Sequence, residues 1–518
     1  MKTAEKLGII GTTISIFGIG FGWGVFPWLI RMQIGRVSLS PGSETREFWE
    51  KIPFPIDFKI HIFNITNHVE VQNEGKIPNL QEIGPYYYKE WKEKSEMIDY
   101  ENDDSITFFM KNTWFDNKEK TLPLTGDEMV IIPNPILVGL ITAAEREKKG
   151  VLPMINKAIP ILFNKPDSVF LKIKVYDLLF GGIIFNCTTK DFSASAVCAV
   201  LKKEAPFLET VSRSVFKFSI LNQKNGTEEP LKLQIKRGIK DYTEVGKVIG
   251  ANGKNKLTNW RGRPCNNLEG TDGTIFPSDI SEHQDIWSFN LELCRSIPAK
   301  FVRKSEYKGI PAFRYNVTIG DTSTDPSLKC LCINDTFCWK KGAMELLKCS
   351  GLPVVATLPH FYDSHEDFLN GVKGLSPNEE NHSIFFDIEP MTGTPLYAKK
   401  RIQFSFPLGK INKIDLTKNL PDTLLPFLWV EESIELPDYL IDKLNSELFR
   451  ILQFLDVIKW VITLFGAGVV SGGVGLYYKE KNSLPITPTS SATSKKIDNP
   501  TDKTTTHELG HTNFGYIN

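Results

Sequence analysis

The sequence predicts an α+β fold, mainly β, in which a large antiparallel β-barrel ectodomain with a helical cap bundle lies between N- and C-terminal transmembrane helices. Two long apolar segments, one near each end, predict the helices. Alternating apolar and polar stretches between them predict the strands, and helical spacing near residues 135–185 predicts the cap. The expected order is residues 1–6 cytoplasmic, 7–30 transmembrane, 31–457 ectodomain, 458–478 transmembrane and 479–518 a disordered cytoplasmic tail.

The two apolar segments are Leu7–Ile30 and Trp460–Tyr478. As helices, segments of about 20 residues cross the ~30 Å hydrocarbon layer of a bilayer. A cleaved signal peptide is the alternative for the first segment. However, the apolar run of this segment is longer than the hydrophobic core of about 7–15 residues in a typical signal peptide, and no A-x-A-like cleavage site follows it. A buried core helix is the alternative for the second, but no charge interrupts it. Two uncleaved spans place both termini on one side of the membrane.

Glycosylation signals and cysteines indicate which side that is, since the positive-inside signal is weak. The Asn-x-Ser/Thr acceptors all fall between the spans: Asn64, Asn186, Asn225, Asn316, Asn334 and Asn381. All eight cysteines also lie between the spans, and five of them fall within Cys294–Cys349. This density is typical of disulfides formed in an oxidising compartment. The region between the spans is therefore expected outside the cytoplasm, and both termini inside it.

Glycines are frequent in both spans. Small-xxx-small pairs occur at Gly18/Gly22, Gly20/Gly24 and Gly468/Gly472. Such pairs let helix backbones approach closely, so they favour contact between the two spans or between two copies of the chain. Ordinary glycine usage in membrane helices is the alternative, and the sequence does not separate the two.

Composition excludes one class of partner. The chain has 61 Lys and Arg residues and 61 Asp and Glu residues, so it has no excess of basic charge. The composition therefore gives no indication of nucleic-acid binding. No Gly/Ser- or Pro-rich linker and no repeat interrupts the central region, which favours one large domain. The tail after Lys479 is rich in Thr, Ser, Pro and Lys and is expected to be disordered.

Period-2 patterns dominate the central region. They are Phe58–Asn67, Ser105–Phe115, Val215–Leu221, Leu231–Gly238, Phe313–Gly320 and Arg401–Gly409. Many strands widely spaced in sequence favour an antiparallel sheet or barrel over βαβ units. Helical spacing runs from Pro135 to Phe163, with a further helix expected over Val175–Phe185 and an amphipathic one over Asp438–Phe454.

No motif predicts an active site, a cofactor or a metal. His507-Glu508-Leu509-Gly510-His511 has the H-E-x-x-H spacing of zinc hydrolases. The motif lies in a Thr-rich tail, Gly510 weakens a helix, and no third ligand follows. His360 and His365 are spaced like ligands but are expected to be polar loop residues, and the acidic run Asp99–Asp104 is expected to be a solvated turn.

The cysteines allow several pairings. Cys330, Cys332 and Cys338 form a C-x-C-x5-C group, in which the first two are too close to pair comfortably with each other. A Cys332–Cys338 bridge would close a very short loop, leaving Cys265 and Cys294 for the later cysteines. Six cysteines still allow 15 connectivities and eight allow 105, so the residues alone do not decide.

Phrases spread over residues 20–460 resemble the class B scavenger receptor family, in family order. They include GWGVFPWLI, REFWEKIPFPIDFKIHIFNITN, EIGPYYYKEWKEK, WRGRPCNNLEGTDGTIFPSDI, VVATLPHFYDS and DIEPMTGTPLYAKKRIQF. Within that family the chain is most similar to the sensory neuron membrane proteins of insects, through Cys187 in IIFNCTT, Cys198 ahead of LKKE, and KRGIKD.

The resemblance implies three bridges, Cys265–Cys330, Cys294–Cys349 and Cys332–Cys338. Cys187 and Cys198 lie outside that set and either form a fourth bridge or remain buried thiols. The cytoplasmic cysteines that carry acyl groups in mammalian members are missing from this chain, so acyl anchoring is not carried over.

The resemblance also implies a capped barrel with an apolar tunnel leading toward the membrane. The family's ligand-contacting lysine falls on Lys165, in the pair Asn164-Lys165. It would attract the polar end of a lipid, and a solvated surface lysine is the alternative.

The function implied by the resemblance is that of a plasma-membrane receptor, not an enzyme. It would bind hydrophobic, lipid-derived, pheromone-like ligands and pass them to the membrane or to an odorant receptor complex. A scavenger or lysosomal receptor of the same family is the alternative, although the tail has no acidic dileucine sorting signal. A hydrolase built on His507, Glu508 and His511 is the third hypothesis, to be tested by His507→Ala.

Overall fold

The computed structural model describes residues 3–34, 37–205 and 207–483. The chain forms two compact units, Gly24–Leu455 and the pair Met1–Trp23 with Asp456–Asn518. The His507–His511 motif lies outside the described residues.

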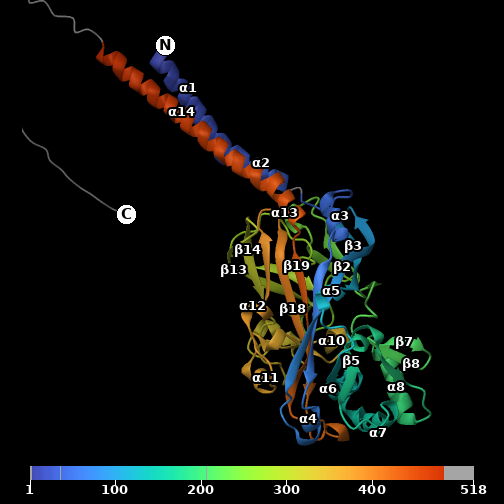
Figure 1. The fold of residues 1–518 in the computed structure, drawn as a ribbon. Coiled ribbons are helices and arrows are strands. Elements are labelled where there is room, and N and C mark those ends of the chain that lie inside the picture. The colour runs from blue at the N-terminus through green and yellow to red at the C-terminus, as the bar shows by residue number, and fades with distance from the viewer. Residues whose placement is uncertain (1–2, 35–36, 206, 484–518) are drawn as a thin grey trace, which may run out of the picture. The chain divides into compact units, whose positions relative to one another are not determined.

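A 14-stranded antiparallel sheet forms the body of the larger unit (Figure 1). Its path runs through β11 (Val248–Ala251), β10 (Leu233–Lys236), β3 (Ser105–Asp116), β2 (Leu80–Tyr100), β1 (Ile56–Ile65), β19 (Thr423–Glu435), β18 (Thr394–Leu408), β17 (Ile384–Glu389), β14 (Ile310–Val317), β13 (Arg295–Tyr307) and β12 (Ile286–Asn290). Thr271 bridges to Lys247, next to β11, and to Ser288 in β12. These bridges bring the two edges together into a nearly closed barrel, which confirms the predicted fold class.

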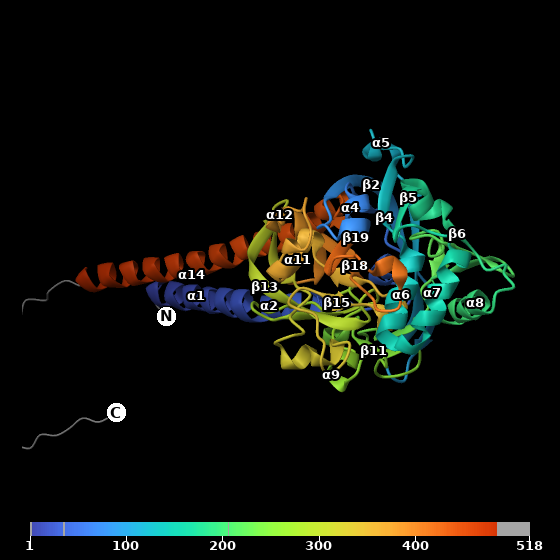
Figure 2. The same cartoon turned by 90° about the horizontal axis from the view of Figure 1, so that it is seen from below.

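Short strands and helices complete this unit. Three strands lie off the path: β9 (Thr227–Glu228), β15 (Met344–Glu345) and β16 (Val355–Thr357). The short helices are α3 (Glu44–Glu50), α4 (His68–Glu74), α5 (Lys118–Thr121), α9 (Arg263–Asn266), α10 (Leu347–Ser350), α11 (Glu366–Asn370), α12 (Glu379–His382) and α13 (Asp438–Leu444). Figures 1 and 2 agree in placing α11 and α12 on one side of the barrel and the cap helices on the other.

The cap contains α6 (Pro135–Glu147), α7 (Leu152–Leu162), α8 (Phe192–Glu204) and two small sheets, β4 (Met129–Pro133) with β5 (Phe170–Lys174), and β6 (Ile183–Asn186) with β8 (Val215–Phe218) and β7 (Glu209–Ser212). The Asn134 side chain accepts hydrogen bonds from the backbone N–H groups of Ile136 and Leu137, and Pro135 occupies the first turn, which explains why α6 starts there.

The expected helix over Val175–Phe185 is only a π-helical turn, Asp177–Gly181, because Gly182 has a φ of 98° and the chain continues as β6.

The alternating stretches agree with β1, β3, β8, β10, β14 and β18 to within a few residues at most boundaries. Two central strands carry no such pattern in the sequence. Polar and aromatic residues occupy both faces of β2, and apolar residues occupy both faces of the first half of β19. Both faces of these strands pack against protein, so simple alternation is lost.

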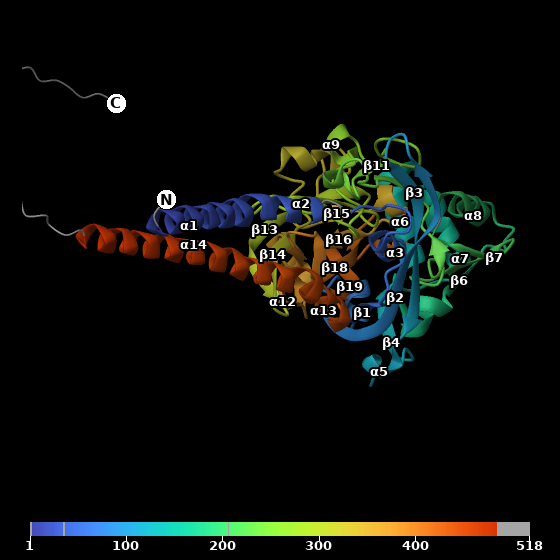
Figure 3. The same cartoon turned by 90° about the horizontal axis from the view of Figure 1, so that it is seen from above.

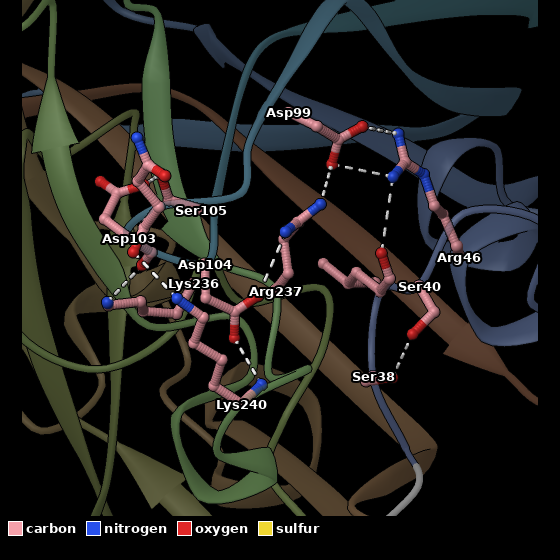
Figure 4. Close-up of polar contacts among 12 residues, drawn as sticks. Ser38, Ser40, Arg46, Asp99, Asp103, Asp104, Ser105, Lys236, Arg237 and Lys240 are labelled. Carbon is pink, nitrogen blue, oxygen red and sulfur yellow. Dashed lines mark hydrogen bonds and ion pairs between the residues drawn. The ribbon is translucent and has the colours of Figure 1, made fainter.

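An ionic network ties residues 37–50 to the barrel (Figure 4). Arg46 and Arg237 both bond to Asp99, at 2.9 and 3.1 Å, and Arg237 also contacts Asp104 at 3.3 Å. Asp104 further accepts a hydrogen bond from the Lys240 backbone N–H. The acidic run is therefore not simply a solvated turn, because two of its carboxylates are paired. Figures 1 and 3 show α3 beside β2 and β3 at this place.

Two long apolar helices run from one unit into the other, and the smaller unit contains the first as far as Trp23 and the second from Asp456 onward. The first comprises α1 (Thr3–Ile19), a π-helical segment (Gly20–Val25) and α2 (Phe26–Ile34), of which Thr3–Ile30 is long and apolar enough to cross a membrane. The second comprises α13, a π-helical turn (Asn445–Phe449) and α14 (Arg450–Asn482), and it also meets that test.

The two helices touch through glycines. A Cβ on Gly11 would lie 2.7 Å from the Val470 backbone nitrogen, and a Cβ on Gly466 would lie 2.5 Å from the Ser15 hydroxyl. Gly18 and Gly22 also lie in the contact, as expected. The pairs Gly20/Gly24 and Gly468/Gly472 do not, because no atom lies within 4 Å of the positions their Cβ atoms would take.

Candidate functional site

Lys165 lies just after α7 of the cap. Its backbone N–H donates to the Pro160 carbonyl at 2.8 Å, and its φ of 50° reverses the chain at the helix end. The side chain is exposed, and it has no ion-pair partner among the residues that the structure describes. An ammonium in this position is open to the solvent around the cap.

Between the cap and the barrel lies a small apolar hollow. It has about 10 Å³ of space, enough for about one water molecule. Its walls come from α6, the residue before β5, the end of β18 and the segment that follows: Val138, Ile141, Thr142, Val169, Pro407, Leu408, Gly409, Ile411, Thr417 and Leu420. Cap and barrel are in close contact here.

A larger cavity of about 290 Å³ lies at α2. This volume is at the lower end of the range for small-molecule sites. Its lining is mainly apolar: Phe26, Pro27, Ile30, Tyr242, Asp279, Met391 and Leu452. Phe26, Pro27 and Ile30 form the last turns of the apolar segment Thr3–Ile30, so the cavity lies where that segment meets the loops of the larger unit.

A group of charged side chains lies inside the barrel. Lys92 on β2 pairs with Glu432 on β19 at 2.8 Å, and Lys400 on β18 pairs with Glu432 at 3.2 Å. Lys400 also pairs at 2.9 Å with Glu292, in the turn between β12 and β13. Since β17, β14 and β13 separate β18 from β12 in the sheet, the last pair runs across the lumen.

The register places these residues on one face of the sheet, and the Lys400–Glu292 pair across the lumen shows that this face is the inward one. Glu432 lies opposite Phe58 of β1 and Lys400 of β18. Residues directly opposite each other in neighbouring strands share one face of the sheet. The sequence does not reveal this group of charges, because the run KEWKEK (residues 89–94) has charged residues at both odd and even positions and so does not show which of them face inward.

Glu90 belongs to the same group and is the most deeply buried member, with 1% of its side chain exposed. Burial raises the pKa of the Glu90 carboxyl to about 8, with Glu432 adding to the effect and Lys92 opposing it. Glu432 and Glu292 differ: although burial opposes ionisation, Lys400 and Lys92 hold the pKa of both carboxyls below their ordinary value. Glu90 is thus held neutral among ionised neighbours.

A second cluster lies on the outer face of the same strands. Glu82 accepts from Trp429 Nε1 at 3.0 Å and contacts His61 at 2.6 Å and His360 at 2.8 Å, while His360 stacks on His382 with ring centroids 4.2 Å apart. Burial opposes ionisation of Glu82, but the two histidines hold its pKa well below the ordinary value. Burial also lowers the pKa of His382 to about 4.

His360 is therefore not the polar loop residue that the sequence predicted. It is buried, and it joins the turn Pro359–Phe361 to the barrel wall. His365 is partly exposed, and its Nδ1 caps α11 by accepting from the Asp367 backbone N–H. The two residues have separate structural roles.

Four disulfides connect the eight cysteines: Cys187–Cys198, Cys265–Cys330, Cys294–Cys349 and Cys332–Cys338. The last three are the pairs implied by the family resemblance. The first joins the end of β6 to α8 within the cap, so Cys187 and Cys198 are bridged rather than free.

The candidate glycosylation asparagines differ in exposure. Asn186, Asn334 and Asn381 are exposed, whereas Asn64, Asn225 and Asn316 are half-buried. Asn225 uses both ends of its amide, accepting from the Trp114 N–H at 2.8 Å and donating to the Trp114 carbonyl at 3.4 Å. Asn64 accepts from the Ile131 N–H at 2.8 Å.

Comparison with known proteins identifies the family. The sequence model of the CD36 family matches residues 9–477. The chain belongs to the CD36 family. It is 41% identical over 486 residues to sensory neuron membrane protein 1 of Apis mellifera, covering 93% of each chain. The protein of that name from Plutella xylostella is 40% identical over 484 residues (93% of this chain, 92% of the relative), and that from Heliothis virescens is 41% identical over 471 residues (90% of each).

Membership of the CD36 family explains the arrangement of the chain. The matched region starts inside the first apolar helix and ends inside the second, so both helices belong to the family's common architecture. The family resemblance predicted from the sequence motifs is thus confirmed, and so is the similarity of this chain to the sensory neuron membrane proteins of insects.

Proposed function

We propose that this chain is a two-pass receptor of the plasma membrane that binds hydrophobic, lipid-derived ligands. It passes them through the interior of its barrel toward the membrane or a neighbouring odorant receptor complex. Pheromone-like odorants are the ligand class, in line with the similarity to sensory neuron membrane proteins. The chain is a receptor rather than an enzyme, because transfer makes and breaks no covalent bond.

One observation carries the proposal: apolar side chains on the inward face of the barrel are only partly buried. Val430 on β19 and Phe404 on β18 are examples. Val430 lies two residues before Glu432 on β19, so it shares the inward face of Glu432 and Lys400 and its side chain points toward the lumen. Open apolar surface inside a barrel is favourable for an alkyl chain, at about 0.8 kcal/mol per methylene removed from water.

The apolar cavity at α2 supports a route toward the membrane. Its lining residues Phe26, Pro27 and Ile30 continue directly from the first apolar helix. In the proposed route a ligand enters near the exposed Lys165 of the cap, crosses the lumen past Val430 and leaves at this cavity. The small hollow beneath α6 implies that entry requires the cap to move away from the barrel wall.

The proposal is tested by narrowing the lumen. Val430→Trp adds bulk at an inward position, and Val302→Trp makes the same change at an outward valine of β13 that is 48% exposed. Cells expressing each full-length variant are given a fluorescent long-chain alcohol, and its transfer into the cells is measured together with surface expression. We expect Val430→Trp to reduce transfer to background at unchanged surface expression, and Val302→Trp to behave like the wild type. Unchanged transfer in Val430→Trp would contradict the proposed route.

A further inference from the structure

The charged group inside the barrel contains polar atoms that the protein leaves unpaired. The charges of Lys92, Lys400, Glu432 and Glu292 balance one another in ion pairs. Both carboxyl oxygens of Glu90, by contrast, have no hydrogen-bond partner among the described residues. Lys92 Nζ approaches Glu90 to 3.5 Å but is already bonded to Glu432 at 2.8 Å.

Two neighbours of Glu90 share this property. Trp114 Nε1 and Asn112 Oδ1 are buried atoms without a hydrogen-bond partner in the part of the chain that the structure describes. Trp114 lies directly opposite Glu90, and Asn112 directly opposite Lys92, in the register of β2 and β3. Side chains directly opposite each other in this way have Cβ atoms about 4.5–5.5 Å apart. The unpaired donor and acceptors therefore form one group on the inward face.

Leaving such groups unpaired is costly. A buried polar group without a partner costs about 1–3 kcal/mol, and each case in a folded protein calls for an explanation. Three unpaired groups on two neighbouring strands indicate a place where an additional molecule supplies the missing hydrogen bonds.

The surroundings define the shape of that molecule. Along the inward face of β2, Tyr86 and Tyr88 precede Glu90, and along β3 the buried Phe108 and Met110 precede Asn112. The polar group therefore lies between apolar surfaces. The unpaired atoms themselves are enclosed, whereas Lys400 and Glu292, which join the group through Glu432, keep 30% and 37% of their side chains accessible. A ligand therefore approaches the group from the side of Lys400 and Glu292, and binding requires a local opening at Glu90.

We propose that Glu90, Trp114 and Asn112 form a polar station inside the barrel that binds the oxygen-bearing head of a neutral long-chain amphiphile. The proposal rests on the proposed function and names the ligand class for it. The head accepts a hydrogen bond from Trp114 Nε1 and, if it is a hydroxyl, donates one to Asn112 Oδ1 or Glu90. The alkyl chain lies along the apolar inward face beside Val430 and Phe404.

The charge balance favours a neutral head over a carboxylate. The two lysines of the group are already matched by Glu432 and Glu292. A ligand carboxylate would add a negative charge without a counterion in an enclosed place, which costs several kcal/mol. Glu90, whose pKa burial raises, is itself neutral and adds no charge that a ligand would have to match.

The experiment measures head-group preference in the full-length chain. The protein is reconstituted in phosphatidylcholine nanodiscs, and binding of radiolabelled 1-hexadecanol, hexadecane and hexadecanoate is measured above protein-free nanodiscs. We expect the wild type to bind hexadecanol about tenfold more tightly than hexadecane, as about 1.4 kcal/mol of added hydrogen bonding predicts. Hexadecanoate at neutral pH should bind more weakly than hexadecanol.

Two pairs of variants assign the preference to the station. Trp114→Phe removes the indole N–H and Glu90→Leu removes the carboxyl, and both should lower the alcohol preference to less than about threefold while hexadecane binding is kept. Trp287→Phe, on the exposed face of β12, and Glu90→Gln, which keeps a neutral polar group, should retain it.

The outcomes separate this inference from the proposed function. An unchanged alcohol preference in both Trp114→Phe and Glu90→Leu would overturn the station but leave the receptor function intact. Tighter binding of hexadecanoate than of hexadecanol would overturn the neutral ligand class. If the wild type bound none of the three probes, the proposed function itself would fail. Thermal unfolding of each variant shows whether it is folded.

Discussion

At the scale of single residues, the inward face of β2 shows how a strand can carry charges into a core. Lys92 and Lys94 alternate with Trp91 and Glu93, and it is the lysines that turn inward. Lys94 donates to the Trp49 carbonyl at 2.6 Å, and burial lowers its pKa to about 8. A buried ammonium is stable only where hydrogen-bond acceptors or carboxylates surround it. The positions of the two lysines therefore indicate that the interior of the barrel contains polar groups.

Glu90 gives a prediction about pH. Burial raises its pKa to about 8 in the folded chain, whereas the unfolded carboxyl ionises near 4.5. Between these values the folded state holds a proton that the unfolded state has released, so this contribution to stability is complete below about pH 4.5 and is lost as the pH rises to about 8. Glu90→Gln cannot ionise and should gain stability relative to the wild type over this window, by on the order of 4 kcal/mol at pH 8, because each unit of pKa difference corresponds to about 1.4 kcal/mol.

The measurement is thermal unfolding of the solubilised chain from pH 4.5 to 9. Glu101→Gln, in the exposed turn between β2 and β3, serves as the matched control and should follow the wild type at every pH. A constant difference between Glu90→Gln and the wild type across the whole range would show that Glu90 is ionised in the folded state.

Glycosylation is a second prediction at the residue scale. Three of the acceptor asparagines are exposed: Asn186, Asn334 and Asn381. The side-chain hydrogen bonds of Asn186 and Asn334 use Oδ1, and the bond at Asn381 uses its backbone N–H, so a glycan on Nδ2 would break none of these bonds. A glycan on Asn225 would disturb the paired bonds to Trp114. We expect peptide mapping after enzymatic deglycosylation to find the first three sites occupied and Asn225 largely unoccupied. High occupancy of Asn225 would mean that this part of the structure tolerates loss of both bonds.

At the scale of elements, the two apolar helices pack with a seven-residue spacing. Gly11 and Gly18 on one helix, and Gly466 and Gly473 on the other, repeat at the interval typical of left-handed packing. The sequence pointed to four-residue pairs, of which Gly18/Gly22 lies in the contact and the others do not. Which glycines face the partner depends on the rotation of each helix, and an apolar segment without charges does not define that rotation.

This packing predicts the effect of added bulk. Cysteines introduced at Gly18 and Thr463, whose side-chain positions are adjacent, should cross-link on oxidation in membranes. Adding Gly466→Leu should reduce the yield at least about fivefold, because overpacking costs about 1–3 kcal/mol. Gly468→Leu places the same side chain where no atom lies within 4 Å and should leave the yield unchanged. Equal yields in the two variants would exclude contact through Gly466.

The cap carries a further prediction at this scale. Cys187–Cys198 closes a loop with a sequence separation of 11 between β6 and α8. Loop entropy assigns such a bridge about 3 kcal/mol. Replacing both cysteines by serine should accelerate hydrogen exchange in β6, β7, β8 and α8, whereas exchange in β13 and β14 should be unchanged. An effect spread evenly over the barrel would show that the bridge supports the whole ectodomain.

At the scale of the whole molecule, the sequence predicted the architecture better than the interior. Apolar length predicted the two long helices, alternation predicted strands such as β1, β3 and β18, and 3.6-residue spacing predicted α6 and α7. The charged group around Glu90 could not be predicted, because the inward face of β2 is known only once the register of β2 against β1 and β3 is known. The buried position of His360 could not be predicted, because its partner Glu82 is remote in sequence.

The orientation of the whole chain gives the last prediction. The disulfides and the exposed Asn186, Asn334 and Asn381 all lie between the two helices, so we expect that region outside the cell and both termini in the cytoplasm. An epitope inserted after Gly253, in an exposed turn with no atom within 4 Å of its Cβ position, should be detected on intact cells. Epitopes added at either terminus should be detected only after permeabilisation. Detection of a terminal epitope on intact cells would mean that one helix does not cross the membrane, and the even number of spans on which the proposed topology depends would be lost.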